Sequence, residues 1–224
     1  MTISTMTFKR LLMITGLIVC SAKAVAADSP LITIQHQWAH CNYQVKGSHN
    51  KEQCLEQLTR MASLALAKQP QRDDLRIWLA ISKSTLAGQK GGFGALSLVK
   101  QARKELEQVI KHDGQELGGS AYTTIGSLYY QVPGWPIGFG SDKKAKKYLK
   151  KALAINPKGI DSNYFYADFL RDQGEKKQAI QYFLKAYKAP KRPNRPLADK
   201  GRRQEIKAKL AKLECTVTNH CFSE

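Results

Sequence analysis

The strongest constraint on this chain is a spacing of small and large residues that repeats over two helical segments. Residues 163–190, "NYFYADFLRDQGEKKQAIQYFLKAYKAP", carry small residues at Ala167, Ala179 and Ala186 among large apolar ones and end in a proline. The apolar positions recur at helical spacing on both sides of Gly174, which predicts two helices joined by a tight turn. One such pair cannot bury its apolar face alone, so the pattern predicts further pairs.

Two earlier segments follow the same pattern with a longer middle. Ala167 and Ala179 stand 12 residues apart, whereas their counterparts Gly126 and Ala145 stand 19 apart. The seven extra residues belong to "VPGWPIGFGS", a stiff, aromatic and nearly uncharged stretch. Upstream, the counterparts are 20 apart and enclose "GQKGGFGALSL". The shared Gly-Phe-Gly motif predicts two inserted loops on the same edge of adjacent units.

These units resemble the tetratricopeptide repeat (TPR), a 34-residue helix-turn-helix unit in which small residues let paired helices approach. The resemblance covers about residues 75–190. It implies an all-α fold, a short TPR-like helical solenoid of about three helix pairs. A leading helix around 52–68 and a trailing helix around 198–213 are expected to cap its two ends.

The N-terminus has the pattern of a secretory signal peptide: a basic pair, a short apolar run, and small residues before a cleavage position near Ala26 or Ala27. We therefore expect a periplasmic or secreted protein, with a lipoprotein acylated at Cys20 as the alternative. The predicted organisation is a signal peptide, a disulfide-tethered N-terminal segment, the solenoid, and a tail with a small disulfide loop, over residues 1–26, 27–50, 51–214 and 215–224.

Four cysteines remain after cleavage, and an even count in an exported chain indicates two disulfides. Proximity favours the local pairs Cys41–Cys54 and Cys215–Cys221. Zinc is the alternative at the first pair, because histidines cluster around it at 36, 40 and 49. The spacing matches no standard zinc pattern, so no metal is expected.

Positive charge is concentrated in the second half of the chain. The whole sequence has a formal net charge of +18, and residues 141–214 hold 21 Lys or Arg against 8 Asp or Glu. Such an excess attracts anions. In an exported protein we expect a protein or peptide partner in the cell envelope, or an anionic membrane surface, rather than nucleic acid. The alternative is that these lysines only solvate helix surfaces.

The TPR resemblance implies a concave groove lined by the first helix of each pair. The corresponding positions that could contact a partner are Arg76, Lys83, Thr123, Ser127, Tyr130, Tyr164, Asp168 and Arg171, with Leu79, Leu86, Ser120 and Asp161 beside them. In the inserted loop, Trp135 and Phe139 are expected to pack on the middle helix pair, either as a structural cover or as a wall beside the groove.

A narrower resemblance concerns the segment that follows this loop. Gly140, Ser141, Asp142, Lys144 and Ala145 are similar to a stretch in exported TPR proteins related to the T component of TRAP-type transporters. No enzyme signature or cofactor motif accompanies it. The sequence thus favours a non-catalytic adaptor that binds a protein segment or a transporter or envelope component. The alternative is a periplasmic component that binds a small ligand between the groove and the Trp135 loop.

Overall fold

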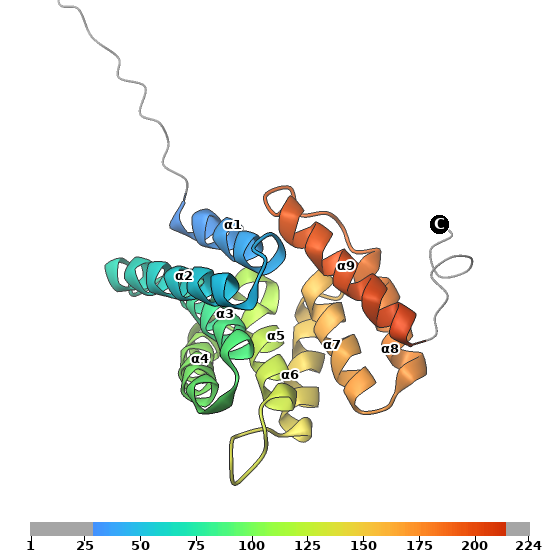
Figure 1. Ribbon diagram of the computed structural model, residues 1–224. Coiled ribbons are helices and arrows are strands. Elements are labelled where there is room, and N and C mark those ends of the chain that lie inside the picture. Colours follow the sequence, from blue (N-terminus) through green and yellow to red (C-terminus); the bar gives the residue numbers. More distant parts are fainter. Residues whose placement is uncertain (1–28, 214–224) are drawn as a thin grey trace, which may run out of the picture.

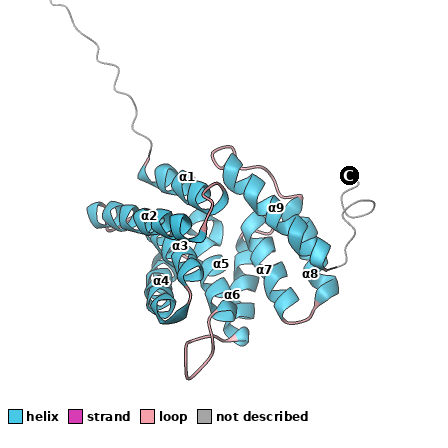
Figure 2. Cartoon of the chain, viewed as in Figure 1, coloured by secondary structure: helices cyan, strands magenta, loops and turns pink. Residues whose placement is uncertain are grey.

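The computed structural model describes residues 29–213, and every regular element in this range is a helix (Figures 1 and 2). In chain order the helices are α1 (Pro30–Tyr43), α2 (Ser48–Lys68), α3 (Asp73–Lys90), α4 (Gly92–Asp113), α5 (Glu116–Gln131), α6 (Asp142–Ile155), α7 (Ile160–Asp172), α8 (Lys176–Tyr187) and α9 (Pro196–Lys212). The predicted fold class is confirmed: the molecule is an all-α, TPR-like solenoid.

Three antiparallel pairs, α3 with α4, α5 with α6 and α7 with α8, form the body. The first helices of the pairs also contact one another, so α3, α5 and α7 form an inner layer and α4, α6 and α8 an outer one (Figure 1). The small residues explain how close the helices lie. A Cβ on Gly126 of α5 would fall 2.7 Å from Cγ of Leu149 on α6, and Ala145 and Ala179 are fully buried.

The N-terminal end differs from the sequence prediction. Two helices, α1 and α2, precede the first pair, and the expected domain boundary at residues 50–51 falls inside α2. α1 was missed because its apolar residues are interrupted by Gln35, His36 and Gln37. It nevertheless buries Ile34 and Trp38 in a cluster shared with α2 and α3, so residues 30–43 are part of the solenoid rather than a tethered extension.

The Cys41–Cys54 disulfide is confirmed and joins α1 to α2, with a Cα–Cα distance of 5.6 Å. Its two thiols are thus unavailable to zinc, and no group of three or more His, Cys, Asp or Glu within residues 29–213 is arranged to hold a metal ion. The expected pair Cys215–Cys221, the tail 215–224 and the signal peptide 1–26 lie outside the described residues.

The upstream insertion does not form a loop. Its residues lengthen α3 to 18 residues and α4 to 22, and the helices meet at Gly91 and Gly92, whose φ angles are 65° and 62°. The prediction of two equivalent Gly-Phe-Gly loops was therefore wrong for this unit. In the middle unit it is correct: residues 132–141 form a loop between α5 and α6 that projects from the body (Figure 1).

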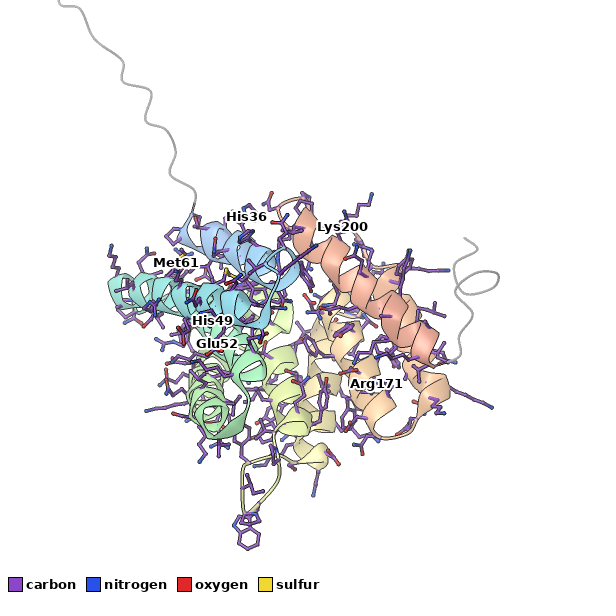
Figure 3. All side chains as sticks on the ribbon, viewed as in Figure 1. His36, His49, Glu52, Met61, Arg171 and Lys200 are labelled. Carbon is purple, nitrogen blue, oxygen red and sulfur yellow. A yellow bond between two sulfur atoms is a disulfide. The ribbon has the colours of Figure 1, made fainter. Side chains whose placement is uncertain are left out.

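The two ends of the solenoid meet. α9 contacts α7 and α8, as a capping helix should, but it also contacts α1. Nε2 of His36 on α1 lies 2.7 Å from the carbonyl oxygen of Asn194, just before α9, and Figure 3 shows the ends of α1 and α9 side by side near His36 and Lys200. The concave side of the arc formed by α3, α5 and α7 is thereby partly enclosed by α1 and α9.

Candidate functional site

The concave side retains a cavity, here called the central cavity, of about 290 Å³. Its walls come from five helices and from the segment that leads into α9. The lining residues are Trp38, Trp78, Ile81, Ser84, Thr85, Gly88, Ser120, Thr123, Thr124, Ser127, Gln131, Asp161, Phe165, Arg195 and Arg202. Aromatic rings form one part of this surface and hydroxyl groups of α3 and α5 another.

On α5, the structure places two of the three predicted groove residues in the wall of the central cavity. Thr123 and Ser127 are buried in the wall of the central cavity, where their hydroxyls donate to carbonyl oxygens of α5 itself, Gly119 at 3.4 Å and Thr124 at 2.8 Å. Because those donations use only the hydrogen, the hydroxyl oxygens keep lone pairs that can accept hydrogen bonds. Ser120 lines the same wall.

The prediction did not hold for α3. Nη1 of Arg76 donates to Oε2 of Glu105 at 2.7 Å, and Nζ of Lys83 lies 3.9 Å from the other oxygen of that carboxylate. Both side chains therefore face α4 rather than the central cavity, whose wall on α3 includes Trp78 and Ile81. Leu79 and Leu86 pack in the cluster shared with α1 and α2. The TPR resemblance assigned the wrong face of α3 to the groove, because α1 and α2 cover the side of that helix that carries Leu79 and Leu86.

On α7 the predicted groove positions are occupied by the protein's own α9. Asp168 accepts a hydrogen bond from Nζ of Lys209 at 2.7 Å, and also bonds with Nε of Arg171 and the hydroxyl of Tyr130 at 2.9 and 3.1 Å. Burial tends to raise the pKa of Asp168, but Lys209 and Arg171 outweigh it and hold the pKa below its usual value. The carboxylate is thus a fixed anchor for α9.

Arg202 of α9 contacts α7 at the same interface, about two turns from Lys209. Its guanidinium lies 4.2 Å from the ring centroid of Tyr164, and its Nε donates to Asp161 at 3.0 Å. Arg192, in the segment before α9, donates to the other oxygen of Asp161 at 2.7 Å. The α7 half of the predicted groove is therefore filled by an intramolecular helix, and no open peptide channel runs along it.

A second surface lies at the projecting loop 132–141. The two arms of the loop are hydrogen-bonded to each other, from the amide of Gly140 to the carbonyl of Pro133 at 2.9 Å and from the amide of Gly138 to that of Gly134 at 3.0 Å. A Cβ on Gly140 would overlap the carbonyl oxygen of Val132. Glycine is required here because the arms approach so closely, and the result is a stiff stem.

The aromatic residues of this loop have separate roles. Phe139 lies at the base, edge-on to Tyr129 at a centroid distance of 5.5 Å and beneath the Arg103 guanidinium at 4.4 Å. Trp135 lies at the tip with 90 % of its surface exposed, and Ile137 is 64 % exposed. The expectation that both aromatic rings pack on the middle helix pair is confirmed for Phe139 and wrong for Trp135, because the stem holds the tip away from the helices.

Beside the tip lies an apolar groove of about 420 Å³ between the α3–α4 turn and the end of α5. Its lining is almost entirely apolar and includes one side of the loop. The residues are Ser84, Ala87, Gly88, Gly92, Ala95, Leu96, Val99, Leu128, Gln131, Val132, Pro133 and Ile137. We call Trp135, Ile137 and this groove the tip–groove surface.

The loop leads directly into a strongly basic helix. Ser141 caps α6 by accepting a hydrogen bond from the amide of Lys144, while Ala145, Leu149 and Ala152 are buried against α5. The opposite face is exposed and carries Lys143, Lys144, Lys146, Lys147, Lys150 and Lys151. A molecule that contacts the loop from this side therefore meets a positively charged surface.

Comparison with known proteins agrees with this architecture. Residues 138–158 and 160–192 match the family model of the tetratricopeptide repeat. A solved structure, described as that of a thermophilic TPR protein in Thermus thermophilus, is similar to this chain with a TM-score of 0.54 and 20 % sequence identity, over 85 % of this chain and 91 % of that one. At that identity the likeness concerns the fold alone. No curated protein sequence matches the chain.

None of the helices within residues 29–213 combines the length and the apolar composition that crossing a membrane requires.

Proposed function

We propose that this protein is a non-catalytic adaptor whose tip–groove surface binds a segment of a partner protein. The observation that carries the proposal is the exposure of Trp135 on a stem that is itself ordered. Tryptophan is one of the residues enriched among those that contribute most of the binding energy in protein interfaces. A rigid presentation lowers the entropy lost when the partner binds.

The chemistry around the tip suggests what the partner segment offers. The apolar groove can accept one or two aliphatic or aromatic side chains, and the exposed lysines of α6, which begins where the loop ends, favour carboxylates in the same partner segment. We therefore propose a partner segment in which apolar residues alternate with acidic ones. The TPR-like fold supports a protein partner because stacked helix pairs provide extended surfaces for such segments.

We also propose that the protein acts in the cell envelope. This rests on the signal-peptide pattern of the N-terminus, and the Cys41–Cys54 disulfide supports it because structural disulfides persist in oxidising compartments. The stretch from Gly140 to Ala145, similar to one in relatives of a transporter component, makes a transport or envelope protein our proposed partner. Cell fractionation with N-terminal sequencing should find the chain beginning near Ala27 outside the cytoplasm.

Site-specific photocrosslinking in intact cells tests the adaptor function. A photoreactive amino acid is placed at Trp135, at Ile137, or at the exposed control Lys200 on α9. We expect a discrete adduct with the same protein from both loop positions and none from the control. The adduct from Ile137 should disappear when Leu96→Glu places a charge in the groove. Equal labelling from the loop and control positions would refute the proposal.

A small ligand bound between the groove and the Trp135 loop was the alternative from the sequence. Trp135 lines neither the central cavity nor the apolar groove, so the geometry gives no support to a pocket that uses its ring.

A further inference from the structure

Arg195 is the residue of the central cavity that the architecture does not account for. It precedes α9 and lines the central cavity, together with an adjoining cavity of about 440 Å³ between the starts of α5 and α7. Its guanidinium lies 4.8 Å from the ring centroid of Trp78. Its Nε atom is buried without a hydrogen-bond partner, and within residues 29–213 its side chain makes no ion pair.

The surrounding charges show why Arg195 is unusual. Arg192 is bound to Asp161 and Asp199 at 2.7 and 2.6 Å. Arg202 is bound to Asp161 and Glu205, and Arg203 contacts Asp199 at 3.6 Å. Four guanidinium groups thus face three carboxylates, and all three carboxylates are held by the other arginines. The guanidinium left without an ion pair is that of Arg195, which lines the cavity beside the Asp161–Arg202 pair.

Burial lowers the pKa of Arg195 to about 10, with Arg192 and Arg202 adding to the decrease and Asp161 opposing it. The side chain therefore remains charged at neutral pH. A charged guanidinium that is partly buried without an ion pair costs free energy, and an anion bound next to it would offset that cost.

The rest of the wall limits the kind of anion. Trp38, Trp78, Ile81 and Phe165 present apolar surface. The hydroxyls of Thr123, Thr124 and Ser127 donate within α5, so they can only accept a hydrogen bond from a ligand. One unpaired guanidinium balances one negative charge, and its fork matches a carboxylate. The exposed Lys158 and Lys191 at the adjoining cavity would attract an anion toward the entrance.

We propose that the central cavity binds a small organic monocarboxylate, with its carboxylate on Arg195 and its aromatic or branched apolar body against Trp38, Trp78 and Phe165. The cavity volume of about 290 Å³ suits a compact ligand of this class. The cavity shares Ser84, Gly88 and Gln131 with the wall of the apolar groove, but the residues proposed to hold the ligand line the cavity and not the groove, so the inference goes beyond the adaptor function and does not depend on it.

The test is calorimetric titration of the full mature chain with phenylacetate, using phenylacetamide as an uncharged probe of nearly the same shape. We expect phenylacetate to bind one site and phenylacetamide to bind at least tenfold more weakly. Arg195→Gln should weaken phenylacetate binding by about tenfold or more, since hydrogen bonds to charged groups are roughly of this strength. Arg60→Gln, which removes an exposed arginine from α2, should leave binding unchanged.

A second measurement separates a binding role from a structural one. Because Arg195 forms no ion pair with the described residues, Arg195→Gln should leave the denaturant midpoint of the unliganded protein unchanged or higher, while the increase in midpoint caused by phenylacetate is lost. Equal binding of phenylacetate and phenylacetamide would overturn the proposal. So would tight binding of inorganic phosphate in place of phenylacetate, or a large loss of stability in the unliganded variant.

Discussion

Asp161 allows the enclosure of the concave side to be tested quantitatively. It lies near the start of α7, and its two oxygens accept hydrogen bonds from Nη1 of Arg192 at 2.7 Å and Nε of Arg202 at 3.0 Å. It therefore ties α9 and the preceding segment to the inner layer. Asp161→Asn keeps the size of the side chain and removes its charge.

The geometry sets the expected loss of stability. A hydrogen bond to a charged group contributes about 1.5–3 kcal/mol, so two of them would give at most about 3–6 kcal/mol. In the variant, Arg192 keeps its ion pair with Asp199, and Arg202 keeps its ion pair with Glu205. The Asp161 side chain is also 28 % exposed, so the loss of stability should be smaller than this maximum. We expect Asp161→Asn to lower the free energy of unfolding by about 2–3 kcal/mol at pH 7.

The stability difference between wild type and Asp161→Asn should also depend on pH, in a direction that follows from the pKa of Asp161. Burial tends to raise the pKa of Asp161, but Arg202 and Arg192 outweigh it and hold the pKa well below its usual range. A carboxylate of this kind stabilises the folded state fully above its unfolded pKa of about 3.9, and the stabilisation is lost as the pH falls toward the folded pKa. The difference between wild type and variant should therefore be constant above about pH 5 and shrink below about pH 4.

Urea unfolding followed by circular dichroism between pH 3 and pH 7 measures both features. Asp172→Asn, which changes an exposed aspartate at the end of the same helix, is the matched control and should change stability by less than about 0.5 kcal/mol. A loss below about 0.5 kcal/mol for Asp161→Asn at pH 7, or a difference that does not depend on pH, would refute the role assigned to Asp161.

Three further predictions concern the Cys41–Cys54 disulfide and the loop 132–141. Cys41→Ser should lower the free energy of unfolding by about 3 kcal/mol, because the disulfide closes a short loop between residues 13 apart; denaturant unfolding without reductant measures it. Gly140→Ala should force the two arms of the loop apart, and faster hydrogen exchange of the Gly138 amide would report this. Trp135→Ala should change the free energy of unfolding by less than about 0.5 kcal/mol, because the ring is exposed. Phe139→Ala should lower it by about 2 kcal/mol, because that ring is packed on Tyr129. Equal effects of the two substitutions would contradict the different roles of tip and stem.

The repeat pattern was readable in the sequence because it reports local packing. Ala167, Ala179 and Ala186 are fully buried where the sequence placed helix contacts, and Gly174 has the positive φ of 77° expected of the turn. These features depend on residues within one unit, so spacing along the chain is enough to reveal them. The inserted length in the first unit was ambiguous, since extra residues can extend helices as easily as they form a loop.

The enclosure of the concave side could not be predicted in the same way. It depends on contacts between residues far apart in the chain, such as Asp168 with Lys209 and His36 with Asn194. In the sequence, the stretch around Arg192 and Arg195 contributed only to a count of positive charge. The three-dimensional arrangement decides which arginines pair with a carboxylate and which one does not. Residue spacing along the chain carries no information about this.

The two candidate surfaces follow from one structural cause. An open TPR-like solenoid would present its inner layer to a partner, but here α9 occupies the α7 part of that layer and α1 closes it from the other end. Enclosure changes a groove for a polypeptide into a cavity of small-molecule size with Arg195 in its wall. Contact with a protein is then left to the outer elements, and the loop displays the side chain of Trp135 rather than burying it. A chain truncated after Arg195 lacks α9, and we expect its concave side to open. The truncated chain should then lose phenylacetate binding while the crosslink from Trp135 persists. Loss of both together, in a chain that still gives a helical spectrum, would contradict this division of roles.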